Sequence, residues 1–510
     1  MNGISQSLRG RSVSRRHLLA GAAAASAAGA LGLTGCDPEG AAPSTEVGQF
    51  EIPDPAGELP TGDVELRVLG TPDSHPAFWA AFGGAYEEKH PNVTIEYEGA
   101  PHPRIREILP LAVRNGTAHD MFLMSGGLVP DAVASGWVRP LDDIIPNFDE
   151  WKAQFPEGIF VPGAHLFDGK TYSVPLSTRK LQATFLLSNT SILERAEVEL
   201  SETPTWDEFR DAAKKITEVG DGEFYGFALP GVRMTNNVRR LTQTAGVGGP
   251  GDIDTQTGRH IASSDEYREA VELILAMQAD GSLLPGSVSM TAQEAPPRVV
   301  TGSVGMIIDG GWMIEGWQND SPDFEFGVSG PPRPSVDSPP TLARDPQGGY
   351  WVNAETANPE VIGDIYSYMG GLEGQIASAQ VKGVTFPSLF PEAREALAAV
   401  VTGPRARAMA EHEQVVLPPY VQVRNTDALM VFEELEEPRM RTPQVLEAIM
   451  VGDVSDVGQA LQDLGDGYDR ALDDAIAAAT AKGAEISRDE WIFPNFDPTE
   501  DYTSADYDAL

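Results

Sequence analysis

Cysteine is almost absent from this chain, because Cys36 is the only one among 510 residues. A single cysteine cannot form a disulfide within the chain, and this one lies at the end of an N-terminal apolar run. We therefore expect neither a disulfide nor a thiol site in the folded part. The length exceeds that of one ordinary hydrophobic core, which predicts two domains or lobes.

Positive charge is also scarce. The chain has 36 Lys and Arg against 76 Asp and Glu, so its formal net charge is −40. A protein that binds nucleic acid needs a basic surface against the phosphates. The composition therefore argues against a nucleic-acid partner and indicates a well-solvated, acidic surface.

Motifs for metals and nucleotides are missing. The eight histidines lack the paired spacing of a zinc site. Residues 163–171 resemble a phosphate loop, but five residues separate its glycines where the motif has four, so we interpret Asp168 and Gly169 as a hairpin turn. The calcium-loop-like stretch from Asp252 has its glycine at position seven instead of six, and we interpret it as an acidic turn. We expect no cofactor and no metal, while the many carboxylates leave a glycosidase-like pair open.

Apolar runs of about 20 residues, the length that spans a membrane, do not occur after the N-terminal region. Residues 18–34 form a shorter run after Arg15 and Arg16, which is typical of an export signal. The paired arginines resemble a twin-arginine signal, with general secretion as the alternative. The run ends in a Leu-Thr-Gly-Cys sequence that resembles a lipobox, in which Cys36 receives a lipid; an uncleaved membrane helix is the alternative. We expect an exported protein anchored to the outer face of the cytoplasmic membrane.

The folded part is expected to be α/β. Residues 37–62 are rich in Pro, Gly and acid and are interpreted as a linker. Alternation in residues 64–68 and 93–97 predicts two strands, and apolar residues at a spacing of four between them predict a helix with Ser74 as N-cap. Strand, helix and strand of these lengths form a βαβ unit with parallel strands. Ser263 and Glu266 predict a capping box for another helix that Gly281 ends.

Four stretches in order resemble one protein family. They are FGGAYEEKHPNVTIEYE at 82–98, the segment 114–143 with Asp120, the segment 167–216 with its DGKTYSVP hairpin, and TGSVGMIIDGGWMIEGW at 301–317. Together they resemble the extracellular solute-binding lipoproteins of ABC importers, the family that includes maltose- and oligosaccharide-binding proteins. His119 replaces the family's usual proline, and the chain beyond about residue 482 departs from the pattern.

The resemblance implies an α/β clamp of two lobes, a periplasmic-binding-protein-like fold of type II. Each lobe is then a mixed sheet flanked by helices, with hinge crossovers near residues 176–182, 329–332 and 418–421. The expected organisation is a signal peptide with lipobox at 1–36, a linker at 37–62, lobe 1 at 63–178 and 330–418, lobe 2 at 179–329 and 419–495, and an acidic tail at 496–510. The tail is either a solvated end or a strap that wraps the fold.

The resemblance and the expected strand ends and crossovers also indicate candidate ligand-binding residues. Trp312 is the first choice, because a tryptophan face stacks on the apolar face of a pyranose and the glycines before it allow a close approach; the alternative is core packing. Other candidates lie at carboxyl ends of strands, at the crossovers, or beside glycines. The full set is Ser74, His75, Ser125, Gly126, Gly127, Arg179, Gln182, Asn236, Asn237, Gly311, Trp312, Tyr350, Trp351 and Arg424. For each, a turn, a surface position or the core is the alternative.

The resemblance implies a binding protein without catalytic residues. It would capture a small-molecule solute, a sugar or oligosaccharide, and deliver it to ABC permease subunits as a monomer tethered through lipidated Cys36. A surface carbohydrate-active enzyme (a lyase or glycosidase) and a sensory lipoprotein remain the alternatives. Turnover of a sugar polymer would favour the first alternative.

Overall fold

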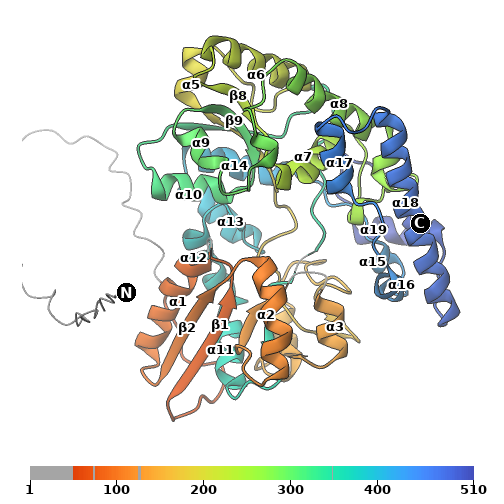
Figure 1. Cartoon of the computed structure of the whole chain (residues 1–510). Coiled ribbons are helices and arrows are strands. Elements are labelled where there is room, and N and C mark those ends of the chain that lie inside the picture. The colour runs from red at the N-terminus through yellow and green to blue at the C-terminus, as the bar shows by residue number, and fades with distance from the viewer. Residues whose placement is uncertain (1–49, 73–74, 125–127, 347) are drawn as a thin grey trace, which may run out of the picture. The chain divides into compact units, whose positions relative to one another are not determined.

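The computed structural model describes residues 50–72, 75–124, 128–346 and 348–510 (Figure 1). Two mixed sheets organise these residues. Sheet A has the order β2-β1-β3-β11-β4, sheet C has the order β10-β7-β9-β8, and β5 and β6 form a hairpin. The strands are β1 Val64–Gly70, β2 Val93–Gly99, β3 Met121–Leu123, β4 Val138–Arg139, β5 Leu166–Phe167, β6 Lys170–Thr171, β7 Phe185–Asn189, β8 Tyr225–Ala228, β9 Val304–Asp309, β10 Phe326–Ser329 and β11 Tyr350–Asn353.

The helices fall into three groups by their packing. Those with sheet A are α1 His75–Lys89, α2 His102–Arg114, α3 Val129–Ala134, α4 Phe148–Lys152, α11 Pro359–Met369, α12 Leu372–Lys382 and α13 Pro391–Ala398. Those with sheet C are α5 Thr190–Arg195, α6 Trp206–Gly220, α7 Gly231–Thr244, α8 Asp265–Ala279, α9 Pro296–Val300, α10 Trp312–Asp320 and α14 Gly403–Gln414. The C-terminal group is α15 Val421–Arg424, α16 Ala428–Glu434, α17 Thr442–Met450, α18 Val457–Ala481 and α19 Ser504–Asp508. Short 3₁₀ helices are η2 Leu141–Asp143, η3 Pro250–Asp252, η4 Ile261–Ser263, η5 Ser287–Ser289 and η6 Arg488–Trp491.

Sheet A begins with the βαβ unit that the sequence predicts. β1 pairs in parallel with β2, with Leu66 opposite Ile95, and α1 connects them. The apolar stripe of α1 is buried, with Phe82 and Tyr86 both 0% exposed. This confirms the parallel strands and the helix between them. The predicted N-cap, Ser74, lies outside the described residues.

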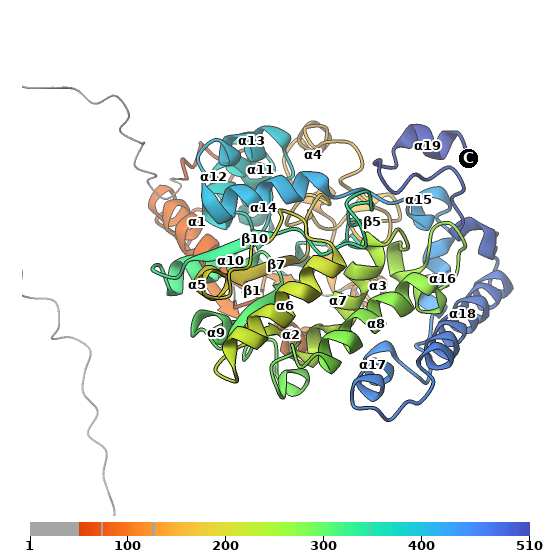
Figure 2. The same ribbon diagram turned by 90° about the horizontal axis from the view of Figure 1, so that it is seen from above.

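Helices cover both faces of sheet C, so its strands are buried on both sides. Leu186 packs toward α5, α6, α7 and α8, while Phe185 and Leu187 pack toward α9, α10 and α14. Figure 2 shows α6, α7 and α8 lying alongside one another. All six residues of β9 are buried, and β9 ends where the two glycines begin. α6 begins with a capping box formed by Thr205 and Glu208.

Local packing at three places bears on the expected boundaries. Phe50 is 8% exposed and packs edge-on against Phe78 and Phe82, so the fold begins inside the expected linker. α14 packs in one cluster with Phe185 of sheet C, and the same cluster contains Ala379 of α12 and Leu397 of α13. The cap of α8 is Ser264, whose side chain accepts from Tyr267 N–H, because Ser263 belongs to η4.

The acidic tail is part of a strap rather than a solvated end. We call residues 488–507 the C-terminal strap. Its Phe493, Phe496 and Tyr502 are buried in one cluster with Leu342 and Val416. Tyr502 N–H donates to Leu417 O at 2.8 Å, and Asp501 pairs with Lys180 at 2.7 Å. The strap therefore connects the first expected crossover with the segment that precedes α15.

A buried histidine joins the segments that run between the two sheets. His412 of α14 accepts at Nδ1 from Gln182 N–H (2.9 Å), which leaves Nε2–H to donate to Val384 O (2.9 Å). Thr341 Oγ1 donates to Gln182 Oε1 at 2.6 Å. Four segments, at residues 182, 341, 384 and 412, are thus fixed to one another through hydrogen bonds.

Candidate binding site

The carboxyl edge of sheet C presents one cluster of polar and aromatic side chains. β8 and β9 are parallel, so the chain leaves both at the same edge of the sheet. α7 follows β8 and carries Arg233 in its first turn, and α10 follows β9 and begins at Trp312. Ligands of α/β sheets bind at such an edge. The edge of sheet C therefore brings together residues that are about 80 positions apart in sequence.

Trp312 is held in a defined orientation. Its ring lies against Gly310, where an added Cβ would come within 2.2 Å of the ring, so only glycine allows this approach. The Arg233 guanidinium carbon lies 5.0 Å from the centroid of the Trp312 ring. Trp312 as a whole remains partly exposed. A fixed indole on a partly exposed residue is a preorganised stacking surface.

Asp309, the last residue of β9, pairs with Arg233. One carboxylate oxygen lies 3.4 Å from the Arg233 guanidinium and accepts from Gly310 N–H at 2.8 Å. Burial raises the pKa of Asp309, and Arg233 opposes that rise. Among the described residues, Asp309 Oδ2 and Arg233 Nε have no hydrogen-bond partner. Both atoms are buried, so Arg233, whose side chain is 25% exposed, is the member of the pair that a solute beside Trp312 can reach.

The carboxyl edge of sheet A holds His75 and Tyr350. His75 is the first residue of α1, and Tyr350 begins β11 opposite Leu123 at the end of β3. The Tyr350 hydroxyl accepts from Trp79 Nε1–H at 2.8 Å and lies 3.1 Å from His75 Nδ1. Burial raises the pKa of Tyr350 well above its usual range, so the hydroxyl keeps its proton.

One short segment contacts both edges. Phe386 packs against the His75 ring at 5.1 Å between centroids. Two residues earlier, Val384 O lies 3.7 Å from the Cβ position of Gly311. Residues 384–386 therefore lie against His75 at the edge of sheet A and against Gly311 at the edge of sheet C.

Among the other expected site residues, Asn236 is exposed, while Asn237 is buried with both amide atoms unpaired within the described residues. Arg179 lies over the Tyr420 ring at 5.1 Å. Ser74, Ser125, Gly126, Gly127 and Cys36 lie outside the described residues.

Three expected site residues are occupied elsewhere. Trp351 is 0% exposed and packs with Phe122 and Phe167, so it offers no stacking wall. Gln182 is 3% exposed and is fixed by Thr341, as described above. Arg424 pairs with Glu490 and donates to carbonyl groups of the C-terminal strap, so it holds the strap instead of a solute.

Arg233 and Asp309 were missed by the sequence analysis. Both share with the candidate Ser125 one feature of the sequence: each is a polar residue at or just after the carboxyl end of a buried strand. Asp309 is the last residue of β9, and Arg233 follows β8 after Pro230 and Gly231. The same rule applied to every strand would have found them.

Metal and membrane signals are absent from the described part of the chain. No group of three or more His, Cys, Asp or Glu side chains there could hold a metal ion. None of the described helices is both long and apolar enough to cross a bilayer.

Two mixed α/β layers, joined by several crossing segments and with polar clusters at their carboxyl edges, define a two-lobe solute-binding protein. A model of the bacterial extracellular solute-binding protein family matches residues 71–376, more than half of the chain. The chain belongs to this family. A binding protein of Brucella abortus (strain 2308) is 27% identical over 293 residues, 58% of this chain and 67% of the relative.

Solved structures agree with the fold. The GacH receptor of Streptomyces glaucescens, solved unliganded and with acarbose, has a TM-score of 0.62 at 20% identity, covering 81% of this chain and 99% of its own. A solute-binding protein of Thermotoga lettingae with α-D-tagatose gives 0.61 at 18% identity, covering 81% and 100%. An ABC substrate-binding protein of Listeria monocytogenes in complex with cycloalternan gives 0.58 at 17%, covering 80% and 99%.

Proposed function

We propose that this chain is the substrate-binding protein of an ABC importer and that it captures a sugar or oligosaccharide between the carboxyl edges of sheets A and C. The observation that carries the proposal is the partly exposed Trp312, whose ring is fixed by Gly310 and Arg233 at the edge of sheet C. An indole face and adjacent charged groups suit a ring with one apolar face and several hydroxyls. The sugar ligands named for three structural neighbours support the same class.

The mechanism requires no bond chemistry. A sugar that contacts both edges binds most tightly when the two sheets approach each other, so it increases the population of that state. The permease then recognises the sugar-bound arrangement. Recognition of one arrangement lets the importer distinguish a loaded binding protein from an empty one.

We also propose that Cys36 is lipidated and anchors the protein to the outer face of the cytoplasmic membrane. The apolar run at residues 18–34, preceded by Arg15 and Arg16, supports export. The residues between Cys36 and Phe50 then tether a monomeric binding protein near its permease.

The experiment that tests the sugar class is a thermal-shift screen. We expect at least one of glucose, maltose, maltotriose, raffinose and mannitol to raise the melting temperature, because a ligand bound only by the fold stabilises it. Arginine, spermidine and a tripeptide mixture serve as controls. Stabilisation by a control compound and by none of the sugars would contradict the proposal.

Trp312→Ala should weaken binding of the sugar found in that screen by at least tenfold, about 1.4 kcal/mol. The variant removes the stacking face but leaves the buried core of sheet C intact. Titration calorimetry measures the change. Trp137→Ala is the matched control. Trp137 is also partly exposed, but it directly precedes β4 and therefore lies at the amino end of that strand, away from the carboxyl edge of sheet A. Equal affinities of Trp312→Ala and wild type would assign Trp312 to packing.

A further inference from the structure

The C-terminal strap lies where the chain crosses between the two sheets. Residues 172–184 lead from the β5–β6 hairpin to β7 of sheet C, and residues 330–346 follow β10 of sheet C toward β11 of sheet A. We call them the first and the second crossing segment. A rotation of one sheet against the other must change backbone angles in such segments. Contacts that hold both of them to a third element therefore resist that rotation.

One carboxylate of the strap contacts two separate connections of the chain. Asp501 Oδ2 pairs with the ammonium of Lys180 in the first crossing segment at 2.7 Å, and Asp501 Oδ1 accepts from Leu417 N–H at 3.0 Å. Leu417 lies between α14 and α15, and its carbonyl oxygen accepts from Tyr502 N–H at 2.8 Å. The side chains of Lys180 and Asp501 are 24% and 32% exposed, so solvent screens their attraction only in part. The strap thus holds the first crossing segment to the chain that follows α14.

The second crossing segment is held to the same connection. Ala343 N–H donates to Val416 O at 2.8 Å, and Val416 N–H donates to Thr341 O at 3.1 Å. The strap packs against this pairing, because its Phe496 is buried in one cluster with Leu342 and Val416. Both crossing segments are therefore tied, with the strap, to the connection between α14 and α15.

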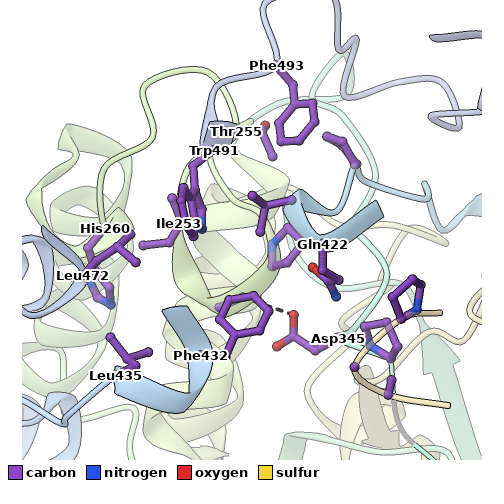
Figure 3. Close-up of a pocket in the computed structure, with 18 of the residues that line it drawn as sticks. Ile253, Thr255, His260, Asp345, Gln422, Phe432, Leu435, Leu472, Trp491 and Phe493 are labelled. Atoms are coloured by element: carbon purple, nitrogen blue, oxygen red, sulfur yellow. Dashed lines mark hydrogen bonds between the residues drawn. The ribbon is translucent and has the colours of Figure 1, made fainter. Parts of the chain in front are cut away.

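Close packing alone does not hold this region rigid. A cavity of about 260 Å³ lies beside the first part of the strap, and Figure 3 shows Trp491 and Phe493 of the strap and Asp345 of the second crossing segment among its lining side chains. Protein interiors contain few voids larger than a water molecule, so the segments around this cavity have room to move. The restraint on the crossing segments therefore depends on the specific contacts of Asp501 and Tyr502.

We propose that the C-terminal strap restrains the rotation of sheet A against sheet C through the Asp501 carboxylate, and that this restraint sets the affinity for the solute. The inference rests on the proposed function and names what controls the population of the sugar-binding arrangement. The strap lies beyond residue 376, where the match to the family model ends. A protein that populates its binding arrangement only in part binds with an affinity reduced by that fraction. Releasing the strap spreads the population over more arrangements and so weakens binding.

The test is Asp501→Ala, which removes both contacts of the carboxylate at a partly exposed position. Spin labels at Glu88→Cys on α1 and Glu218→Cys on α6, both exposed positions, report the distance between the helices of the two sheets in a chain with Cys36→Ser. Pulsed electron paramagnetic resonance should give a broader distance distribution for Asp501→Ala than for the unsubstituted strap, without sugar. The dissociation constant for the best binder among glucose, maltose, maltotriose and raffinose should rise about three- to tenfold.

Asp497→Ala is the matched control. Asp497 also belongs to the strap, but its carboxylate accepts from Thr499 N–H at 2.8 Å and from Thr499 Oγ1–H at 2.6 Å, within the strap itself. This variant should leave both the distance distribution and the dissociation constant unchanged. An unchanged distribution in Asp501→Ala, or an equal or lower dissociation constant, would overturn the restraint. Binding of none of the four sugars by the wild type would count against the proposed function, while the distance distributions would still decide whether the strap restrains the sheets.

Discussion

Arg233→Met is expected to lower the free energy of unfolding by about 3 kcal/mol near pH 8, because it leaves Asp309 buried without its cation. The Asp309 side chain is 1% exposed, and Arg233 is the cation that pairs with it in the described part of the chain. Breaking a buried ion pair from one side costs more than the pair itself contributes, since the remaining charge stays desolvated. Urea unfolding at several pH values measures the loss.

The pH dependence of this loss has a definite sign. Burial raises the pKa of Asp309 and Arg233 opposes the rise, so the variant raises that pKa further. A carboxyl whose folded pKa lies above its unfolded pKa stabilises the fold at low pH and loses that contribution as pH rises through the folded pKa. The deficit of Arg233→Met should therefore be largest at high pH and shrink as pH falls.

Two controls separate this effect from a general loss of packing. The double variant Arg233→Met with Asp309→Asn should recover most of the lost stability, because no buried charge remains. Arg195→Met removes an arginine from an exposed pair with Glu223 (3.6 Å) and should change stability by less than about 0.5 kcal/mol. A deficit that is constant between pH 5 and 8 would contradict the role of Asp309.

His412 should make the fold sensitive to acid. Burial lowers the pKa of His412 to about 4, below its usual value of 6.5. A group with a depressed folded pKa contributes stability above its unfolded pKa and loses it as pH falls through the folded pKa. At about 1.4 kcal/mol per pKa unit, the loss between pH 7 and pH 4 amounts to about 3 kcal/mol.

The measured quantity is the difference between wild type and His412→Asn. Burial also lowers the pKa values of His119 and His260, so the wild-type curve alone contains their contributions. The variant is expected to be less stable than wild type at pH 7 and to approach it at pH 4. Parallel stability curves would show that His412 does not titrate between the folded and unfolded states over this range.

Local patterns in the sequence predicted the elements that depend on neighbours along the chain. The hairpin at Asp168 and Gly169 is confirmed by their positive φ angles of 48° and 76°, which a tight turn requires. Strand β9 ends directly before Gly310 and Gly311, and Trp317 lies in the core at 5% exposure.

Contacts between distant segments could not be predicted in this way. Trp312 and Trp351 both follow glycine pairs, yet of the two only Trp312 is partly exposed, because Trp351 packs in a cluster with Phe122 and Phe167. Gln182 and Arg424 found partners more than 60 positions away, at Thr341 and in the C-terminal strap. Those partners depend on how the strap and the crossing segments pack together. Patterns of neighbouring residues in the sequence do not specify that packing.

A crystal structure with the sugar that gives the largest thermal shift tests the central claim most directly. We predict electron density for a sugar ring against the partly exposed Trp312, with hydrogen bonds from the Arg233 guanidinium to its hydroxyls and contact with the sheet A edge at His75 or Tyr350. Density for the sugar at a position that contacts neither Trp312 nor the edge of sheet A would contradict the account.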